Sequence, residues 1–232
     1  MAYQHDAQLA NIVTSYCTCF GGILPLLFTA FTRRHPARWV FVYACVLITG
    51  VPTVWLHAME GNRVASLFDV GTNILLAYAI QIAFSLDFLQ PRTRRTLIAV
   101  MAVVNLLVWT YLALEVRAVE KTPLLNFGGF GQFYAGEVAL ILNAWVAVGV
   151  IAVSYAKIPR HARPLFWMFF SFFLAGMLIA AAGNDQISIY IFPWHAFWHV
   201  LGCMGFITLW VFNHHRFFGL PEVDSGRGMI HP

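Results

Sequence analysis

The chain has 232 residues, of which 60% are hydrophobic and only 10% are charged. A soluble domain carries about 25% charged residues, so this composition excludes an ordinary soluble domain and predicts an integral, multi-pass membrane protein. The formal net charge is +4, but the basic residues stand in short clusters between apolar runs, so nucleic acid is not an expected partner.

Apolar runs long enough to cross a bilayer follow one another along the chain, since a span needs about 20 apolar residues. Turn and charge signals divide them into seven predicted spans, at residues 9–31, 38–58, 66–89, 95–116, 133–156, 164–183 and 190–212. The expected fold is an all-α membrane protein, a seven-transmembrane helix bundle. It occupies residues 1–216, and residues 217–232 form a cytoplasmic tail.

The basic residues predict the orientation of this bundle. Most of them lie in the first, third and fifth loops or after the last span: Arg33, Arg34, Arg38, Arg92, Arg94, Arg95, Lys157, Arg160, Arg163, Arg216 and Arg227. Only Arg63, Arg117 and Lys121 belong to the other loops. Because cytoplasmic loops are enriched in Lys and Arg, the N-terminus is expected outside and the C-terminus in the cytoplasm. A bacterial inner membrane and a eukaryotic endomembrane fit equally well.

Several ionisable residues lie inside the predicted spans, where an Asp at a helix centre costs about 2.5–3.5 kcal/mol. His57 lies at the outer end of the second span, Asp69 near the outer start of the third, and His195 and His199 in the outer half of the seventh. These four residues therefore share one depth on three helices. A site in the core of a helix bundle requires such an arrangement.

The spacing of His195 and His199 favours a metal site. Residues four apart on a helix have Cβ atoms about 5–6 Å apart, so both imidazoles can reach one ion. His57 supplies a third ligand and leaves a position open for water, as in catalytic zinc sites. The segment lacks the glutamate of His-Glu-x-x-His, so Asp69 is the candidate general base. Thr53, one turn deeper than His57, either supports the water or oxyanion or bonds to the carbonyl four residues earlier.

Other polar residues are weaker candidates. Asn73, one turn from Asp69, is expected to hydrogen-bond it or to line a cavity. Glu137 in the fifth span is a candidate substrate contact, proton relay or snorkelling residue. Trp198, between the histidines, is a candidate substrate contact or an interfacial belt residue. Asp87, beside a basic loop, is expected to pair with an arginine.

Two other interpretations of the histidines stay open. They are either packed in the core or interface without a metal, or His57 and one histidine of the last span bind haem. The haem interpretation leaves the second histidine of the pair and Asp69 without a role.

Taken together, Thr53, His57, Asp69 and the segment "HAFWH" that contains His195 and His199 resemble the CREST superfamily of seven-transmembrane metal hydrolases. Within that group they are most similar to the alkaline ceramidases. The resemblance implies that the three histidines bind Zn2+ and that Asp69 and Thr53 position the water that attacks an amide carbonyl. Thr53 stands where those proteins have Ser, and their acidic calcium-binding segment has no counterpart in "MAYQHDAQLANIV".

The expected function is a zinc-dependent intramembrane hydrolase that cleaves the amide bond of ceramide or a related N-acyl lipid. Its expected partners are this membrane lipid substrate and the surrounding lipid bilayer. The resemblance also leaves two alternatives open. One is a receptor or lipid-binding protein of the adipoQ-receptor or hemolysin-III type, and the other is a lipid esterase of the lipid-remodelling type found in the same group.

Overall fold

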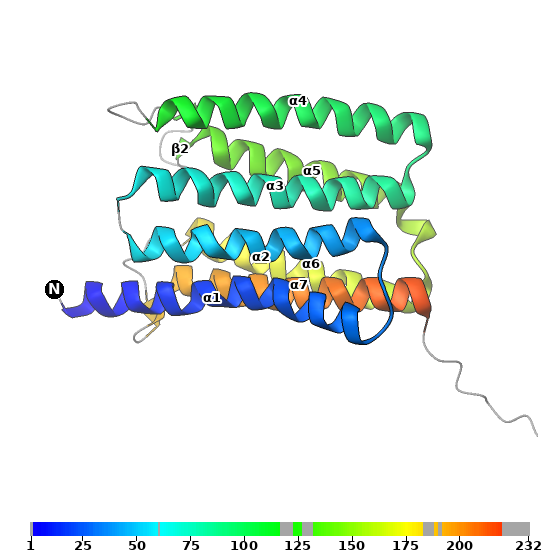
Figure 1. Ribbon diagram of the computed structural model, residues 1–232, viewed down its shortest axis with the longest axis horizontal. Coiled ribbons are helices and arrows are strands. Elements are labelled where there is room, and N and C mark those ends of the chain that lie inside the picture. Colours follow the sequence, from blue (N-terminus) through cyan, green and yellow to red (C-terminus); the bar gives the residue numbers. More distant parts are fainter. Residues whose placement is uncertain are drawn as a thin grey trace, which may run out of the picture.

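The computed structural model describes residues 2–59, 61–116, 123–126, 132–182, 188–189 and 192–219. Seven helices make up most of this part of the chain (Figure 1). They are α1 (Ala2–Phe31), α2 (Ala37–Ala58), α3 (Arg63–Phe88), α4 (Pro91–Glu115), α5 (Ala135–Ser154), α6 (Arg163–Ala182) and α7 (Trp194–Phe218). Two short 3₁₀ helices, η2 (Tyr155–Lys157) and η3 (Arg160–Ala162), link α5 to α6.

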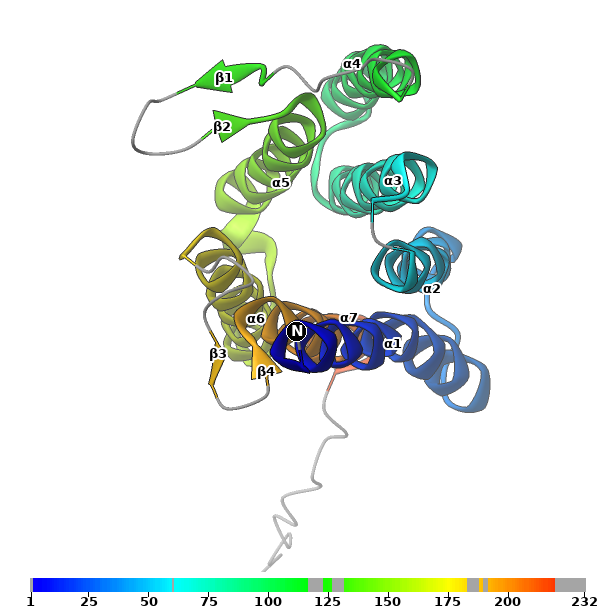
Figure 2. The same cartoon turned by 90° about the vertical axis from the view of Figure 1, so that its left-hand side faces the viewer.

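Two short antiparallel strand pairs, which the sequence does not predict, precede α5 and α7 (Figure 2). In the first, β1 (Leu125–Asn126) pairs with β2 (Gln132–Phe133). In the second, β3 (Ser188–Ile189) pairs with β4 (Phe192–Pro193). Strands of two residues are too short for alternating hydrophobicity to reveal them.

The all-α prediction is confirmed, and the helices match the predicted spans to within a few residues at most ends. In the described part of the chain, α1, α2, α3, α4, α5 and α7 are long and apolar enough to cross a membrane. Two helix starts differ from the prediction because of proline. Pro91 occupies the first turn of α4, where its missing N–H costs nothing. Pro193 stands in extended conformation immediately before α7, so that helix begins at Trp194.

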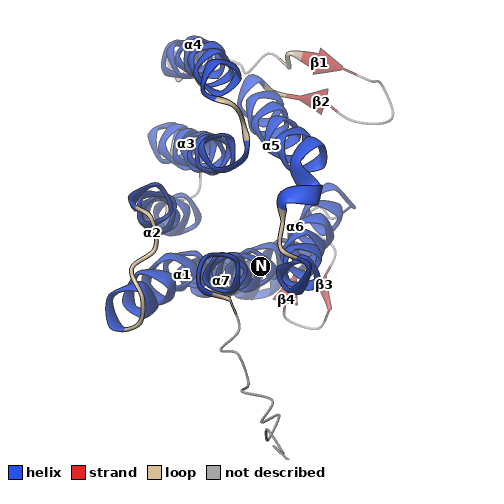
Figure 3. Cartoon of the chain, turned by 90° about the vertical axis from the view of Figure 1, so that its right-hand side faces the viewer, coloured by secondary structure: helices blue, strands red, loops and turns tan. Residues whose placement is uncertain are grey.

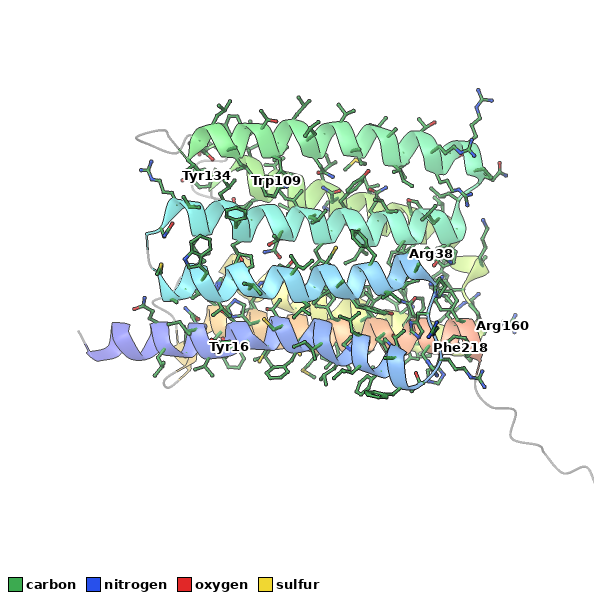
Figure 4. All side chains as sticks on the ribbon, viewed as in Figure 1. Tyr16, Arg38, Trp109, Tyr134, Arg160 and Phe218 are labelled. Carbon is green, nitrogen blue, oxygen red and sulfur yellow. The ribbon has the colours of Figure 1, made fainter. Side chains whose placement is uncertain are left out.

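Viewed along the helix axes, the bundle is a ring with one additional helix on its outside (Figures 2 and 3). Around the ring, α7 packs against α1, α1 against α2, α2 against α3 and α3 against α5, while α6 packs against α7. The additional helix, α4, packs against α3 and α5. The labelled Arg38, Arg160 and Phe218 lie at one end of the bundle, and Tyr134 lies at the other (Figure 4).

Two glycines allow α1 and α2 to approach closely. A methyl group at Gly22 would come within 2.8 Å of the Cα of Leu47, and one at Gly50 within 2.7 Å of the backbone nitrogen of Cys19. Small residues at such positions are typical of helix pairs in membranes, where close backbone packing replaces the hydrophobic effect. The side chains of α1 are therefore held at a fixed height beside those of α2.

An ion-pair cluster joins α2, α3 and α7 at the basic end of the bundle. Asp87 pairs with Arg38 and, at 2.6 Å, with Arg216, and it accepts a hydrogen bond of 2.9 Å from the indole of Trp39. The expected pairing of Asp87 with arginine is confirmed. The cluster adjoins the main apolar core, which includes Trp39 and Phe84, so it ties the three helices together beside that core.

A reciprocal amide pair fastens the outer helix α4 to α5. The Asn143 amide nitrogen donates to the Asn105 oxygen at 2.7 Å, and the Asn105 nitrogen donates to the Asn143 oxygen at 3.1 Å. Both side chains are buried. Since unsatisfied polar groups are costly inside a membrane, the two amides satisfy each other.

Candidate metal centre

Three histidines from two helices meet in the half of the bundle away from the ion-pair cluster. His57 lies in the last turn of α2, while His195 and His199 lie in the first two turns of α7. One ring nitrogen from each residue lies within 4.8 Å of the other two. The Nε2 atoms of His57 and His195 are 3.2 Å apart. The histidines that the sequence singled out are thus brought together.

The arrangement of the three rings fits a single metal ion. Two nitrogens bound to a tetrahedral zinc at about 2.0–2.1 Å lie about 3.3 Å apart, close to the separation of the His57 and His195 nitrogens. The rings are strongly inclined to one another, with interplanar angles of 62°, 70° and 87°. Three imidazoles suit zinc, copper, iron or nickel, so this donor set could hold a metal ion and does not name which one.

Helix α1 supplies contacts to the histidines that the sequence analysis missed. Thr14 Oγ1 lies 3.1 Å and Ser15 Oγ 3.5 Å from Nδ1 of His199, which is 3% exposed. The Gln8 amide donates to the backbone oxygen of His57 at 3.4 Å. A signal for this face of α1 was available. Polar residues recur at helical spacing within its apolar run, at Asn11, Thr14, Ser15 and Thr18.

Thr53 and Asp69 form a direct contact between α2 and α3. The Thr53 hydroxyl lies 2.5 Å from Oδ1 of Asp69 and also 2.9 Å from the backbone oxygen of Thr49. The contact with the Thr49 oxygen is the predicted bond to the carbonyl four residues earlier, and the contact with Asp69 was not predicted. A hydroxyl has one hydrogen and donates it to one acceptor at a time, so the two contacts compete for the same proton.

An internal cavity of about 380 Å³ connects these residues. His57, His195, His199, Thr53 and Asp69 line its polar end. Asn73 and Trp198 also line it, together with Thr18 of α1. Asn73 donates to the backbone oxygen of Asp69 at 2.9 Å, so it contacts the turn that holds Asp69 and leaves the Asp69 carboxylate to Thr53.

The rest of the cavity wall is apolar and comes largely from α5 and α6. Phe166, Phe169, Phe170 and Phe173 of α6 face α5 residues that include Trp145. Trp145 of α5 and Leu174 of α6 line the cavity and are 68% and 46% exposed. These two side chains of the cavity wall are therefore covered little by other residues.

Glu137 lies apart from the histidines. It occupies the first turn of α5, where it is exposed, and its carboxylate accepts a hydrogen bond of 3.0 Å from the backbone of Tyr134. It borders a separate pocket of about 270 Å³ with Arg63 and Glu115. In the structure Glu137 caps a helix, because α5 begins only two residues before it.

No family model matches the chain, and no curated protein matches its sequence. The fold and the site by themselves define an all-α protein with multi-pass membrane character and a three-histidine candidate metal centre.

Proposed function

We propose that this chain is a zinc-dependent intramembrane hydrolase that cleaves the amide bond of ceramide or a related N-acyl lipid. The observation that carries the proposal is a cavity that is polar at one end and apolar at the other. Three converging histidines and the Thr53–Asp69 pair line one end, and aromatic side chains line the remainder. The choice of zinc and of an amide rests on the resemblance to alkaline ceramidases.

The proposed bundle crosses the membrane seven times, with α6 as the sixth span and the N-terminus outside. The ends of the helices support this topology. The first, third and fifth loops, which carry most of the basic residues, lie at the end of the bundle where the C-terminus of α7 lies (Figure 1). By the positive-inside rule this end is cytoplasmic, and the histidines then lie in the outer half of the membrane.

The apolar part of the cavity suits a lipid chain. Its aromatic wall would hold an acyl chain while the scissile carbonyl lies beside the histidines. Trp145 of α5 and Leu174 of α6 line the cavity and are exposed, and the substrate would enter from the bilayer between these two helices. Sites for small molecules are usually mainly apolar with a few polar groups, and this cavity has the same character.

The chemistry is divided among named residues. His57, His195 and His199 would hold the ion, and a zinc ion held there would polarise the carbonyl and make water a stronger nucleophile. The Asp69 carboxylate would accept the proton that the attacking water loses, and would pass it to the leaving amine. In this mechanism Thr53 would donate its hydrogen to Asp69 and not to Thr49, and so would hold the carboxylate in place from α2.

The direct test is a hydrolysis assay on the purified full chain with isotope-labelled lipids. We expect fatty acid release from N-acyl lipids, loss of release after treatment with a chelator, and recovery on adding zinc. A matched panel of ester lipids separates an amidohydrolase from an esterase. Zinc-containing protein that turns over no lipid would replace the hydrolase with the receptor or lipid-binding alternative.

A further inference from the structure

Two hydroxyl groups of α1 converge on Nδ1 of His199. Thr14 and Ser15 are 6% and 0% exposed, and their oxygens lie 3.1 and 3.5 Å from His199 Nδ1. The mechanism proposed above assigns no step to either residue. Their contact nevertheless bears on whether His199 is able to bind a metal, because a neutral imidazole has a hydrogen on one nitrogen and a free lone pair on the other.

Both hydroxyls have backbone oxygens within reach as acceptors for their hydrogens. Thr14 donates to the backbone oxygen of Ala10 at 2.8 Å, with Asn11 a longer acceptor at 3.3 Å. Ser15 donates to the backbone oxygen of Asn11 at 2.6 Å. Such bonds to the preceding turn are the usual choice of a helical Ser or Thr inside an apolar environment. Each oxygen therefore presents lone pairs, not a hydrogen, to His199.

Lone pairs on two oxygens repel a lone pair on Nδ1 and attract an Nδ1–H. The His199 hydrogen therefore belongs on Nδ1, and the lone pair belongs on Nε2. We propose that Thr14 and Ser15 are positioning residues that hold His199 in its Nδ1–H tautomer and so present Nε2 to the metal. This inference rests on the metal centre of the proposed function. It adds a third helix to that centre, since α1 orients a ligand that α7 carries.

The height of the two hydroxyls is set by the backbone of α1. Glycines hold this helix close to α2 on the side of Leu47 and Cys19, and α1 also packs along α7. The hydroxyls thus cannot slide along His199 without separating α1 from both neighbours. A fixed hydrogen-bond acceptor behind a metal-binding histidine is the usual means by which proteins select its tautomer.

The test measures zinc affinity by competition with a chelator, on full-length protein in detergent. The double variant Thr14→Val and Ser15→Ala is expected to bind zinc about 10–100-fold more weakly than the wild type. Thr14→Ser keeps a hydroxyl and should retain the wild-type affinity. Thr208→Val is the matched control, because Thr208 is similarly buried on α7 and, among the described residues, its hydroxyl bonds only to the preceding turn, at Met204.

A second readout does not depend on metal. Nitrogen-15 NMR of the metal-free protein, with His199 assigned by substitution, reports which ring nitrogen carries the hydrogen. We expect Nδ1–H in the wild type and a mixture of tautomers in the double variant. An Nε2–H wild type, or a double variant with wild-type zinc affinity, would overturn the role of the hydroxyls and leave the hydrolase proposal intact. A wild type that binds no zinc would overturn the metal centre itself, and the NMR readout would still decide the tautomer.

Discussion

The Thr53 hydroxyl lies 2.5 Å from Oδ1 of Asp69 and so links α2 to α3 beside the three histidines. Residues 16 positions apart in the chain thereby place a carboxylate at the polar end of a cavity that is otherwise mostly apolar. The proposed chemistry depends on this carboxylate more than on any other group that is not a metal ligand.

Asp69→Asn should abolish most of the hydrolysis while leaving zinc in place. The amide retains the size of the carboxylate but cannot accept the proton, and the loss of a general base lowers turnover by about 10²–10⁴-fold. Thr53→Ser should stay active, because it keeps the hydroxyl. Turnover and metal content, measured on the same preparations, test whether Asp69 is the general base. An Asp69→Asn variant with the wild-type rate would remove Asp69 from the mechanism.

His199→Ala should eliminate stabilisation by zinc. A ligand that binds only the folded state stabilises it by about 2.7 kcal/mol at 100 times its dissociation constant, so added zinc should raise the thermal midpoint of the wild type. His161→Ala is the control, since this exposed histidine lies at the other end of the bundle against the His215 carbonyl. Equal midpoint shifts in all three proteins would place the zinc elsewhere.

The amide pair between α4 and α5 should behave as one unit. Asn143→Leu leaves the buried Asn105 without its partner and is expected to lower the free energy of unfolding by about 1–2 kcal/mol. The double variant with Asn105→Leu should recover most of that loss. Thermal midpoints in detergent measure the coupling, with the exposed Thr110→Val on α4 as control. Additive losses would mean that the two amides act independently.

The stability of the bundle should fall as pH is lowered from about 6.5 to about 4. Burial, with smaller contributions from His214 and Arg216, lowers the pKa of His35 from 6.5 to about 4. The unfolded chain therefore takes up a proton in this window while the folded chain does not, so acid favours unfolding. His35→Asn should flatten the dependence of the thermal midpoint on pH. A variant with the same slope as the wild type would assign that slope to other groups.

Most of the fold was predictable because bilayer thickness sets the length of a span and charge marks its ends. The spacing of His195 and His199, together with the depth that they share with His57 and Asp69, was enough to predict residues that line the polar end of the cavity. The neighbours of each helix were not predictable, because a single apolar span shows nothing of which helix it packs against. The polar face of α1 that contains Thr14 and Ser15 was visible in the sequence, but its contact with His199 was not.

Glu137 illustrates a second limit. With the predicted span starting at residue 133, Glu137 is an acid inside the span. In the structure α5 starts two residues later, at Ala135, and Glu137 caps the helix by accepting a hydrogen bond from the backbone of Tyr134. The depth of a residue in the membrane is hardest to predict at the ends of a span. A charged residue there serves either inside the span or as a cap of the helix. Residues deeper in a span, such as His199, do not carry this ambiguity.

His57 and His195 are 138 residues apart in the chain, and this separation has a consequence for biosynthesis. Until ribosomes have made α7, the growing protein contains only one of the three histidines. Metal therefore has no complete site during insertion of the first six helices, and a truncated or wrongly inserted product would be unable to load it. Under the proposed function, zinc uptake would mark the completion of assembly, and hydrolysis of lipids would begin only after it.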